Sequence, residues 1–424
     1  MTTTAESILV QGKAARQAAK ALARCSTDQK NRALENVATA LLEHQQEVLE
    51  ANEKDLQVSR DMGLSESVLD RILLNSQRLE GMARDVRNIA ALPDPVGEVF
   101  DMGTRPNGLL IGKKRVPLGV VGSIYENRPN VTVDISALCL KSGNGCILRG
   151  GKEAINSNRV LAGLIQGAIG EAGLPRDAVQ FVDDPDRKLV ESMLRMDQYI
   201  DLMIPRGGAE FIRYVAEKAT MPVVAGGVGV CHTYLDRAAD LEKAVAIAYN
   251  AKVQRPTVCN ALDTLLVHSE VAARHLPSVA RQWAQAGVEM RCDRRALSIL
   301  GPLEELNVKA AAPEDWGTEF LSLVAGVKVV DSLDQALEHI ESYGSGHSEA
   351  IVTEDYGAAM RFLDEVDAAA VFVNASTYFT DGAQFGLGAE VGISTQKFHA
   401  RGPMGLKELT SYKWIVLGSG QVRT

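Results

Sequence analysis

The fold class that the sequence predicts is α/β, with two parallel-sheet domains and a small β arm. From Pro117 onward, short apolar runs alternate with longer segments of helical periodicity, which is the pattern of β-α-β units in a mainly parallel sheet. A second series of this kind runs over residues 262–374 and indicates a second α/β domain. The chain has 424 residues, which is also more than one ordinary hydrophobic core accommodates.

The first part of the chain is predicted to be helical. Thr27 is the expected N-cap of a helix whose apolar residues recur on one stripe, at Leu34, Val37, Ala38, Leu41 and Leu42. Prolines and a glycine break the helical pattern over residues 92–97. Residues 103–108 then lie between short extended pieces and are typical of a hairpin, which we expect to belong to the β arm.

The sheet of the first domain is predicted from four apolar runs, each of which has the length of one buried strand. They occupy residues 119–124, 145–148, 179–182 and 200–204. Helical segments fill the intervals, at residues 134–141, 154–172 and 187–194. A further helix opens after Gly207 and Gly208.

Three strand-to-helix turns of this domain carry polar residues and glycines, at residues 125–130, 149–152 and 205–208. Parallel sheets bind ligands beyond the carboxyl ends of their strands, so these turns are the candidate ligand edge. In the last two, glycines and cations precede a helix N-terminus, which suits a phosphate group. The usual dinucleotide fingerprint G-x-G-x-x-G is missing there. The three turns together nevertheless favour a nucleotide ligand.

Cys259 is the candidate nucleophile, because its neighbours are polar. It follows Arg255 and Pro256 and precedes Asn260, on an expected loop entering a helix, with the strand-like residues 262–267 close behind. A cation or a helix N-terminus close to a thiol favours the reactive thiolate. A small buried cysteine is the alternative, and the local sequence leaves both interpretations open.

Composition excludes several function classes. The net charge is −9 without any Lys/Arg-rich block, which argues against a nucleic-acid partner. The six cysteines include no C-x-x-C pair, and no histidine follows or precedes them at zinc-ligand spacing. We therefore expect neither a metal site nor a disulfide framework. With no apolar run long enough for a bilayer and no leader-like N-terminus, we expect a cytoplasmic protein without a membrane partner.

Several motifs along the chain carry a family resemblance. The run from Pro117 to Ile124 resembles the core of the aldehyde dehydrogenase superfamily, and the likeness continues in order through Asn127, Pro129, Ala137, Gly143, Asn144, residues 173–175, Gly226 and Gly227 to Cys259. Residues 204–208, 254–261 and 330–351 are similar to the branch of that superfamily that reduces gamma-glutamyl phosphate. The resemblance implies an aldehyde dehydrogenase-like fold.

The resemblance also implies the catalytic roles. Cys259 attacks the acyl phosphate and holds a thioester, and Asn127 forms an oxyanion hole with the backbone N–H of Cys259. One such donor contributes about 3 kcal/mol in the transition state. Hydrolytic relatives carry a water-activating Glu where Val224 stands here. Because Val224 cannot accept a proton, the thioester is expected to persist for hydride or phosphate.

The resemblance implies NADPH as the cofactor. Arg149 and Lys152 lie by the adenosine ribose, and a cation at Lys152, where NAD-preferring relatives carry a carboxylate, favours a 2′-phosphate. The pyrophosphate is approached by Pro205, Arg206, Gly207 and Gly208, and the nicotinamide ribose by Glu319. For the substrate, the candidates are Arg255, His347, Asn374 and Ser376.

The expected domains follow the same resemblance. Residues 1–99 and 117–255 form a cofactor-binding domain, and residues 256–397 a catalytic domain. Residues 100–116 and 398–424 form an oligomerisation arm and C-terminal return, with residues 412–417 paired to the hairpin. An exposed two-stranded arm is marginally stable alone, so we expect a homodimer or homotetramer.

The predicted reaction is NADPH-dependent reduction of gamma-glutamyl phosphate to glutamate-5-semialdehyde, with release of phosphate, as a step of proline biosynthesis. The upstream glutamate kinase is a candidate partner. Two alternatives remain: a CoA-acylating aldehyde dehydrogenase, which also lacks the water-activating base, and a non-catalytic scaffold of the same fold. The presence of both Cys259 and Asn127 argues against the scaffold.

Overall fold

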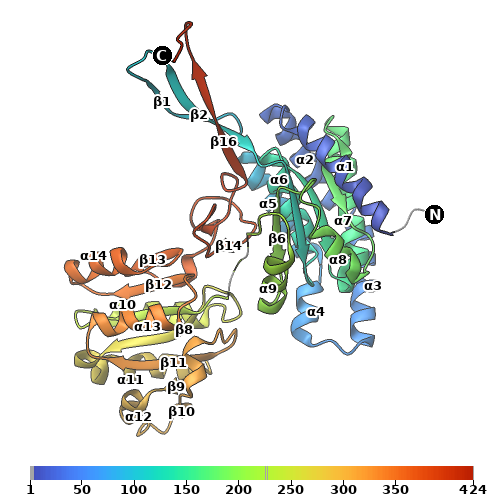
Figure 1. The fold of residues 1–424 in the computed structure, drawn as a ribbon. Helices are drawn as coiled ribbons and strands as arrows, with labels where there is room; N and C mark the ends of the chain where they lie inside the picture. Colours follow the sequence, from blue (N-terminus) through green and yellow to red (C-terminus); the bar gives the residue numbers. More distant parts are fainter. Residues whose placement is uncertain (1–3, 225, 227, 424) are drawn as a thin grey trace. The chain divides into compact units, whose positions relative to one another are not determined.

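The computed structural model describes residues 4–224, 226 and 228–423, and the chain divides into two compact units (Figure 1). The first unit comprises Met1–Gly226, Gly386–Gly392 and Met404–Thr424. The second unit comprises Gly227–Phe385 and Ile393–Pro403. Gly227, which takes part in the family resemblance, lies outside the described residues.

A parallel sheet in the first unit confirms the strands predicted for this part of the chain. Within the residues described there, four strands lie in the order β5-β4-β3-β6. Their bounds are β3 Val120–Tyr125, β4 Gly145–Gly150, β5 Val179–Phe181 and β6 Leu202–Arg206. All residues of β3 are buried, as expected for a central strand that helices cover on both faces.

Helices pack around this sheet. They are α1 Thr4–Leu22, α2 Thr27–Glu43, α3 Gln45–Asp61, α4 Glu66–Ile72, α5 Ser76–Ala91, α6 Asn130–Lys141, α7 Ile155–Glu171, α8 Arg187–Met193 and α9 Ala209–Lys218. Residues of α1, α8 and α9 share one apolar cluster with β3, β4 and β6. The helices α6 and α7 pack on β4, β5 and each other, and α2 covers them from outside. The predicted stripe of α2 is buried from Leu34 to Leu41.

The start of α2 differs from the prediction by one residue. Ser26, not Thr27, is the N-cap: its Oγ accepts from the N–H of Gln29 at 3.2 Å, and the Gln29 side chain accepts from the Ser26 N–H in return. This reciprocal capping box satisfies two free backbone donors. The Thr27 hydroxyl instead donates to Asp94 at 2.9 Å. A distant partner therefore decided between two neighbouring hydroxyl residues.

The second unit contains a larger parallel sheet. Among its described residues, seven strands lie in the order β10-β9-β11-β8-β7-β12-β13. Their bounds are β7 Cys231–Leu235, β8 Leu262–His268, β9 Glu289–Cys292, β10 Val308–Ala310, β11 Val324–Val330, β12 Ser348–Val352 and β13 Ala370–Val373. All neighbouring pairs are parallel, which confirms the second α/β series.

Helices cover both faces of the second sheet. One apolar cluster joins it to α10 Leu241–Val253, α11 Ser269–Gln285 and α12 Arg294–Leu300. Another joins it to α13 Leu333–Tyr343 and α14 Tyr356–Glu365. The described residues also form four short 3-10 helices and one small antiparallel pair. The 3-10 helices are η1 Lys152–Ala154 and η2 Arg176–Ala178 in the first unit, and η3 Pro313–Gly317 and η4 Thr377–Phe379 in the second; the pair is β14 Ile393–Ser394 and β15 Gly402–Pro403.

An antiparallel sheet forms the predicted β arm (Figure 1). It consists of β1 Val99–Thr104, β2 Leu110–Pro117 and β16 Thr410–Leu417 in the order β1-β2-β16. The expected pairing of the hairpin with the C-terminal strand is confirmed, since Thr410 to Leu417 pair with Pro117 to Leu110. β16 lies at the edge of this sheet, and its side chains Tyr412, Trp414, Val416 and Leu417 are exposed.

The compact units divide the chain at residue 226, so α10 belongs to the second unit, whereas the sequence placed it before a boundary at residue 255. The functional division into cofactor-binding, catalytic and oligomerisation parts stays a prediction. No helix among the described residues is both long and apolar enough to cross a bilayer.

Candidate active site

Three strand ends of the first unit carry predicted site residues. Tyr125, the last residue of β3, is in register with Gly150 of β4 and Arg206 of β6. Because these strands are parallel, the turns that follow them leave the sheet side by side at its carboxyl edge. The three turns that the sequence singled out are therefore neighbours.

Asn127 lies in the turn after β3 in an uncommon backbone conformation. Its φ is +44°, in the left-handed region that Asn tolerates better than most residues. A Cβ built on Gly151 would lie 3.4 Å from the Asn127 nitrogen, so the second turn passes close to the first. The Asn127 side-chain oxygen is buried and has no hydrogen-bond partner among the described residues. Buried polar atoms are normally paired, so this position fits a ligand that supplies a donor.

Arg149 and Lys152, the predicted adenosine-side residues, differ in their surroundings. Arg149 donates from Nη2 to the carbonyl of Pro185 at 2.9 Å, and burial lowers the pKa of its guanidinium. Its Nε is buried without a partner in the described part of the chain. Lys152 is exposed at the start of η1. The two cations thus lie on one turn, Arg149 partly buried and Lys152 in solvent.

A carboxylate lies at the predicted pyrophosphate turn. Oε2 of Glu126 accepts from the N–H of Gly208 at 3.1 Å, at the N-terminus of α9. A Cβ on Gly207 would lie 2.6 Å from the same oxygen, so glycine permits this approach. The helix dipole favours an anion here, and in this structure the anion is Glu126 itself. Nothing in the local sequence indicated this contact, because Glu126 was grouped with the turn after β3.

Cys259 lies in the second unit, on the loop between α10 and β8. The expected helix after this loop is wrong: the chain passes directly into the central strand β8. Cys259 is half-buried, whereas Cys139, Cys146, Cys231 and Cys292 are buried. Burial raises the pKa of the Cys231 thiol well above its usual range. Among the cysteines of the second unit, Cys259 is therefore the one that solvent and substrate can reach.

The backbone of Cys259 is held by a glycine. A Cβ on Gly229 would lie 1.8 Å from the Cys259 carbonyl oxygen and 2.8 Å from its Cα, so no larger residue fits. The N–H of Gly229 donates to Oε1 of Glu319 at 3.0 Å. Burial raises the pKa of Glu319, and this hydrogen bond partly opposes the shift. The structure thus brings Glu319, predicted from the resemblance, next to the glycine that supports the candidate nucleophile Cys259.

A buried ion pair anchors the segment that carries Glu319. Oδ1 of Asp263 accepts from the N–H of Phe320 at 3.1 Å and lies 3.7 Å from Nζ of Lys252. Burial raises the pKa of Asp263 to about 6, against the opposing attraction of Lys252. The Lys252 ammonium also donates to the carbonyl of Leu262 at 2.7 Å. These contacts connect the Glu319 segment to the strand that follows Cys259.

A ring of hydrogen bonds surrounds the Cys259 loop. Asn260 donates from Nδ2 to the carbonyl of Thr380 at 3.0 Å, and the Thr380 hydroxyl bonds Ser348 at 2.7 Å. Ser348 bonds Nδ1 of His347 at 2.8 Å. The thiol of Cys231 lies 3.8 Å from the same nitrogen and donates to the Cys259 carbonyl at 3.3 Å. The loop is therefore fixed from both sides.

The predicted substrate residues do not share one environment. His347 is on a loop, as expected, but it is buried, and burial lowers its pKa to about 4, so it is neutral at pH 7. The side-chain amide of Asn374 bonds the backbone of Thr353: its Oδ1 accepts from the Thr353 N–H at 2.9 Å, and its Nδ2 donates to the Thr353 carbonyl at 2.8 Å. Ser376 caps η4 by accepting from the N–H of Tyr378. Arg255 is exposed, four residues before Cys259.

The comparison with known families decides the assignment of the chain. The model of the aldehyde dehydrogenase family matches residues 2–308. The chain belongs to the aldehyde dehydrogenase family. A relative named gamma-glutamyl phosphate reductase, from Dehalococcoides mccartyi (strain CBDB1), is 61% identical over 409 residues, 96% of each chain. A relative of the same name from Persephonella marina is 55% identical over 96% of this chain and 93% of its own.

Solved structures of the aldehyde dehydrogenase family agree with the fold. The crystal structure of gamma-glutamyl phosphate reductase from Thermotoga maritima matches with a TM-score of 0.95 and 47% identity, over 98% of this chain and 99% of that one. A propionaldehyde dehydrogenase from Rhodopseudomonas palustris with bound CoA matches with a TM-score of 0.69 at 15% identity, over 96% of both chains. That likeness concerns the fold alone. The aldehyde dehydrogenase-like fold predicted from the sequence is confirmed.

Membership of the aldehyde dehydrogenase family implies a nicotinamide cofactor and a small-molecule substrate. The sequence named Cys259, Asn127 and the three turns as candidates, which they remain, and it gave no role to Gly229, Cys231 or Glu126. For Gly229 a signal existed, the dense glycines just after Val224. For Cys231 and Glu126 there was none, since their contacts join residues far apart in the chain.

Proposed function

We propose that the chain reduces gamma-glutamyl phosphate to glutamate-5-semialdehyde with release of phosphate, as the reductase step of proline biosynthesis. The observation that carries this proposal is the 61% identity to a protein named gamma-glutamyl phosphate reductase over 96% of both chains. The half-buried Cys259, on a loop that Gly229 and Asn260 hold, provides the nucleophile such a reaction needs.

Cys259 performs the covalent chemistry in this proposal. Its thiolate attacks the acyl phosphate carbon, a C–S bond forms, and the phosphate leaves with the C–O bonding electrons. The amide Nδ2 of Asn127 and the backbone N–H of Cys259 stabilise the negative charge on the acyl oxygen. The nicotinamide cofactor, when bound, supplies the hydride that reduces the thioester. The aldehyde then leaves and Cys259 is regenerated.

The environment of Val224 supports retention of the thioester. Val224 is 2% exposed, and its backbone N–H donates to the carbonyl of Met203 at 2.9 Å, so it is part of the packed core. A valine cannot activate water by accepting a proton. Hydrolysis of the thioester therefore lacks the base that hydrolytic relatives carry at this position. Phosphate or hydride reacts with the thioester instead.

For the cofactor we propose NADPH, with NADP in the reverse reaction. The exposed ammonium of Lys152 and the guanidinium of Arg149 lie on the turn after β4 and suit a 2′-phosphate. In the adjacent turn, the buried side-chain oxygen of Asn127 has no hydrogen-bond partner among the described residues, so a bound ligand can donate a hydrogen bond to it. Pro205, Arg206, Gly207 and Gly208 approach the pyrophosphate, and Glu319 the nicotinamide ribose.

Replacing Lys152 by Glu tests this assignment. A carboxylate would repel the 2′-phosphate and offer acceptors to two ribose hydroxyls instead. We expect the ratio of kcat/KM for NADPH over NADH to fall about tenfold or more, the usual effect of losing one charge-assisted contact. The matched control is Lys54→Glu on α3, which makes the same charge change at another exposed lysine. An unchanged ratio would place the 2′-phosphate contact elsewhere.

Among the four substrate candidates, Arg255 is the one with an exposed cation. We propose that it binds a carboxylate or phosphate oxygen of the substrate. The amide of Asn374 is engaged with Thr353, and His347 is buried and neutral, so these two and Ser376 serve the substrate by shaping the loops around Cys259.

The proposal also includes the cellular context. No disulfide joins any of the six cysteines, all of which lie in the described part of the chain. Reduced cysteines are usual in the cytoplasm, where we place the enzyme. We further propose a homodimer or homotetramer held by the β arm. The upstream glutamate kinase remains the proposed partner.

The decisive experiment runs the reaction backwards. Glutamate-5-semialdehyde and NADP are supplied with phosphate, arsenate or CoA as the acyl acceptor, and NADPH formation is measured. We expect activity with phosphate and arsenate, because both can attack the thioester and leave with the acyl group. Activity that needs CoA and ignores phosphate would overturn the proposal in favour of a CoA-acylating enzyme.

A second measurement separates covalent catalysis from binding. Cys259→Ala should abolish turnover while NADPH still quenches protein fluorescence with the wild-type affinity. Cys292→Ala provides a control, since Cys292 is buried and burial raises its pKa. Turnover that survives the loss of the Cys259 thiol would refute the covalent mechanism.

A further inference from the structure

A cationic pocket lies in the first unit, at the point where the β arm leaves it. Its volume is about 690 Å³. Six cationic side chains line it, and no Asp or Glu is among its described lining residues; the cations are Arg16, Lys20, Arg24, Lys114, Arg115 and Lys413. In a chain of net charge −9, such a concentration of one sign needs an explanation.

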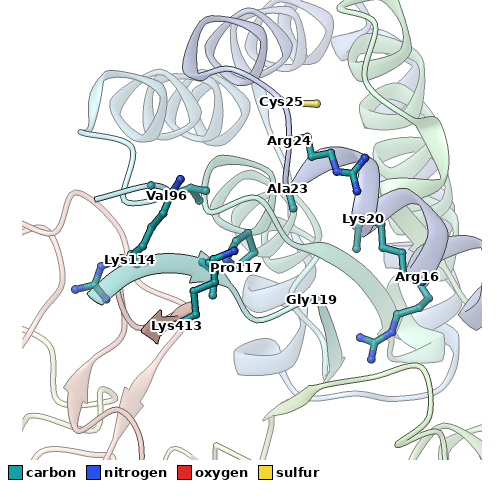
Figure 2. Close-up of a pocket in the computed structure, with 14 residues that line it drawn as sticks. Arg16, Lys20, Ala23, Arg24, Cys25, Val96, Lys114, Pro117, Gly119 and Lys413 are labelled. Atoms are coloured by element: carbon teal, nitrogen blue, oxygen red, sulfur yellow. The ribbon is translucent and has the colours of Figure 1, made fainter. Parts of the chain in front are cut away.

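The cations come from two sides of the pocket, one formed by the end of α1 and the other by the strands β2 and β16 (Figure 2). Arg16, Lys20 and Arg24 come from the last turns of α1 and the residues just after it, four positions apart. Lys114 and Lys413 come from the strand side. These two lysines are direct cross-strand partners in the pairing of β2 with β16. Like charges directly opposite each other destabilise a sheet, so this pair is costly unless an anion compensates it.

Most of these charges have no ion-pair partner in the part of the protein that the structure describes. Arg16 pairs with Asp201, and Arg115 with Glu98 at 2.9 Å. By contrast, no carboxylate in the described part of the chain forms an ion pair with the other four cations, which are Lys20, Arg24, Lys114 and Lys413. Cations near the end of α1 interact well with its dipole, which explains Lys20 and Arg24. That effect does not reach Lys114 and Lys413 on the strands.

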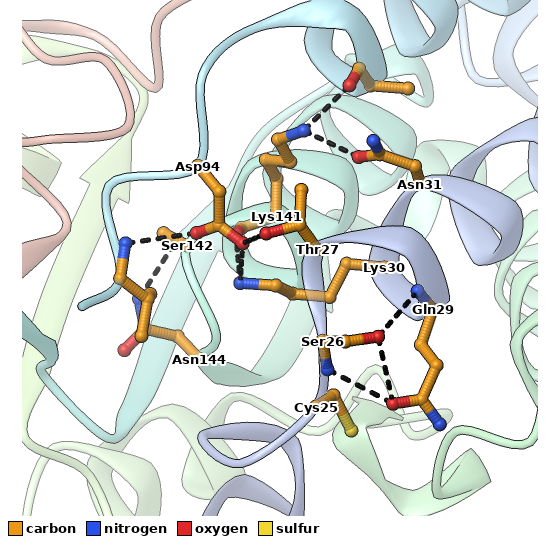
Figure 3. Close-up of polar contacts among 12 residues, drawn as sticks. Cys25, Ser26, Thr27, Gln29, Lys30, Asn31, Asp94, Lys141, Ser142 and Asn144 are labelled. Carbon is orange, nitrogen blue, oxygen red and sulfur yellow. Dashed lines mark hydrogen bonds and ion pairs between the residues drawn. The ribbon is translucent and has the colours of Figure 1, made fainter. Parts of the chain in front are cut away.

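The wall of the pocket is fixed by a buried polar network (Figure 3). Nζ of Lys30, 1% exposed, lies 2.5 Å from Oδ2 of Asp94. The Thr27 hydroxyl donates to the same oxygen, and the N–H of Val96 donates to Oδ1 at 2.9 Å. Asp94 thus joins the first turn of α2 to the turn that contributes Val96, and its charge is paired with Lys30. The cavity is therefore preformed, and this nearby carboxylate does not neutralise its cations.

We propose that this pocket binds a small polyanion that carries two or more phosphate groups. The four cations that lack an ion-pair partner among the described residues match the three to four negative charges of pyrophosphate, tripolyphosphate or a nucleoside triphosphate. A volume of about 690 Å³ is within the usual range of small-molecule sites. The mixture of arginines and lysines suits phosphate, since guanidinium binds it in a bidentate manner. The ligand joins α1 to the root of the β arm.

The site is separate from the machinery proposed for the reductase. None of its described lining residues is assigned to the nucleophile, the oxyanion hole, the cofactor or the substrate. Its occupation therefore does not depend on the proposed function being correct. Because the ligand contacts both β2 and β16, its binding stabilises the arm against local opening.

Isothermal titration calorimetry with tripolyphosphate tests the proposal, at low salt and in a Lys152→Glu background that weakens phosphate binding at the proposed cofactor site. We expect saturable binding of one tripolyphosphate per chain. Lys20→Glu and Lys114→Glu should each weaken it about tenfold or more, the effect of losing one charge-assisted contact and adding a repulsive charge. Lys54→Glu, which changes an exposed lysine elsewhere in the same unit, should leave it unchanged.

Parallel titrations identify the source of the phosphates. ATP that binds more tightly than tripolyphosphate assigns a nucleotide, and equal affinities assign the phosphate chain alone. Absence of saturable binding would overturn the proposal. So would an equal loss in Lys54→Glu, which indicates diffuse attraction. If Lys114→Glu instead dissociates an oligomer without changing tripolyphosphate binding, the pocket receives an acidic surface of a second copy, and the proposal is also overturned.

Discussion

At the scale of single residues, the backbone of Cys259, the proposed nucleophile, lies against that of a glycine. Gly229 lies so close to Cys259 that an added Cβ would be 1.8 Å from the cysteine carbonyl oxygen. The same glycine presents its N–H to Glu319. One small residue therefore separates the proposed nucleophile from a carboxylate proposed to hold the nicotinamide ribose.

Replacing Gly229 by Ala forces one of these backbones to move. Such overpacking costs about 1–3 kcal/mol of unfolding free energy. A displaced nucleophile costs more in rate, and we expect kcat to fall about 100-fold. Steady-state kinetics and urea unfolding measure the two effects. Gly163→Ala on α7 is the matched control, since no described atom outside its own helix lies within 4 Å of the position that its Cβ would take. Wild-type kcat in Gly229→Ala would contradict this role of Gly229.

At this scale, the sequence named Cys259 as a candidate from its polar neighbours and Asn127 from the family resemblance. Their catalytic roles stay predictions. Gly229, Cys231 and Glu126 were missed because their roles arise from contacts across about 30 to 90 positions of the chain, such as those of Cys231 with Cys259 and Gly229 with Glu319. No local pattern encodes such distances.

At the scale of elements, the strands were predicted well because a parallel sheet demands continuous apolar runs. β3 and β4 begin and end within two residues of their predicted bounds. The N-cap of α2 and the element after Cys259 were predicted wrongly. Ser26 and Thr27 both have capping hydroxyls, and only Asp94, 67 positions beyond Thr27, separates their roles. The loop of Cys259 enters β8, because the apolar run 262–267 outweighs the helix expected from its polar start.

The N-terminus of α9 leads to a prediction at the same scale. Glu126 accepts from the N–H of Gly208, which we assign to the cofactor pyrophosphate. Two anions at one helix end repel each other, by about 1 kcal/mol for exposed charges a few ångströms apart. Glu126→Gln should therefore tighten NADPH binding about fivefold at low salt, and less at high salt. Fluorescence titration measures the affinity. Glu217→Gln, in the last turn of α9, makes the same charge change and should leave the affinity for NADPH unchanged. Weaker NADPH binding in Glu126→Gln would contradict the prediction and show that the Glu126 carboxylate holds the cofactor.

At the scale of the whole molecule, buried histidine links stability to pH. Burial lowers the pKa of His347 to about 4, whereas an unfolded histidine titrates near 6.5. Between these values the unfolded chain binds the extra proton, so stability falls as the pH drops from 6.5 to 4. The loss from this residue is about 3 kcal/mol when complete.

Urea unfolding of the wild type and of His347→Gln at a series of pH values tests this linkage. We expect the variant to lose less unfolding free energy than the wild type between pH 6.5 and pH 4, since glutamine takes up no proton. His44→Gln is a control, because His44 is exposed at the junction of α2 and α3. Parallel pH profiles for wild type and His347→Gln would show that His347 reaches solvent before the unit unfolds.

The proposed oligomer depends on the β arm. β16 pairs with β2 on one side, and Tyr412, Trp414 and Val416 are exposed along it. An apolar edge strand of this kind attracts another chain, and natural proteins protect such edges with charge. Val416→Lys adds that protection and leaves the contact of Tyr412 with Trp414 in place. We therefore expect a shift from oligomer to monomer in size-exclusion chromatography with light scattering.

Val58→Lys, at an apolar residue of similar exposure on α3, should keep the oligomer. A wild-type oligomer in Val416→Lys would mean that the chain associates through another surface.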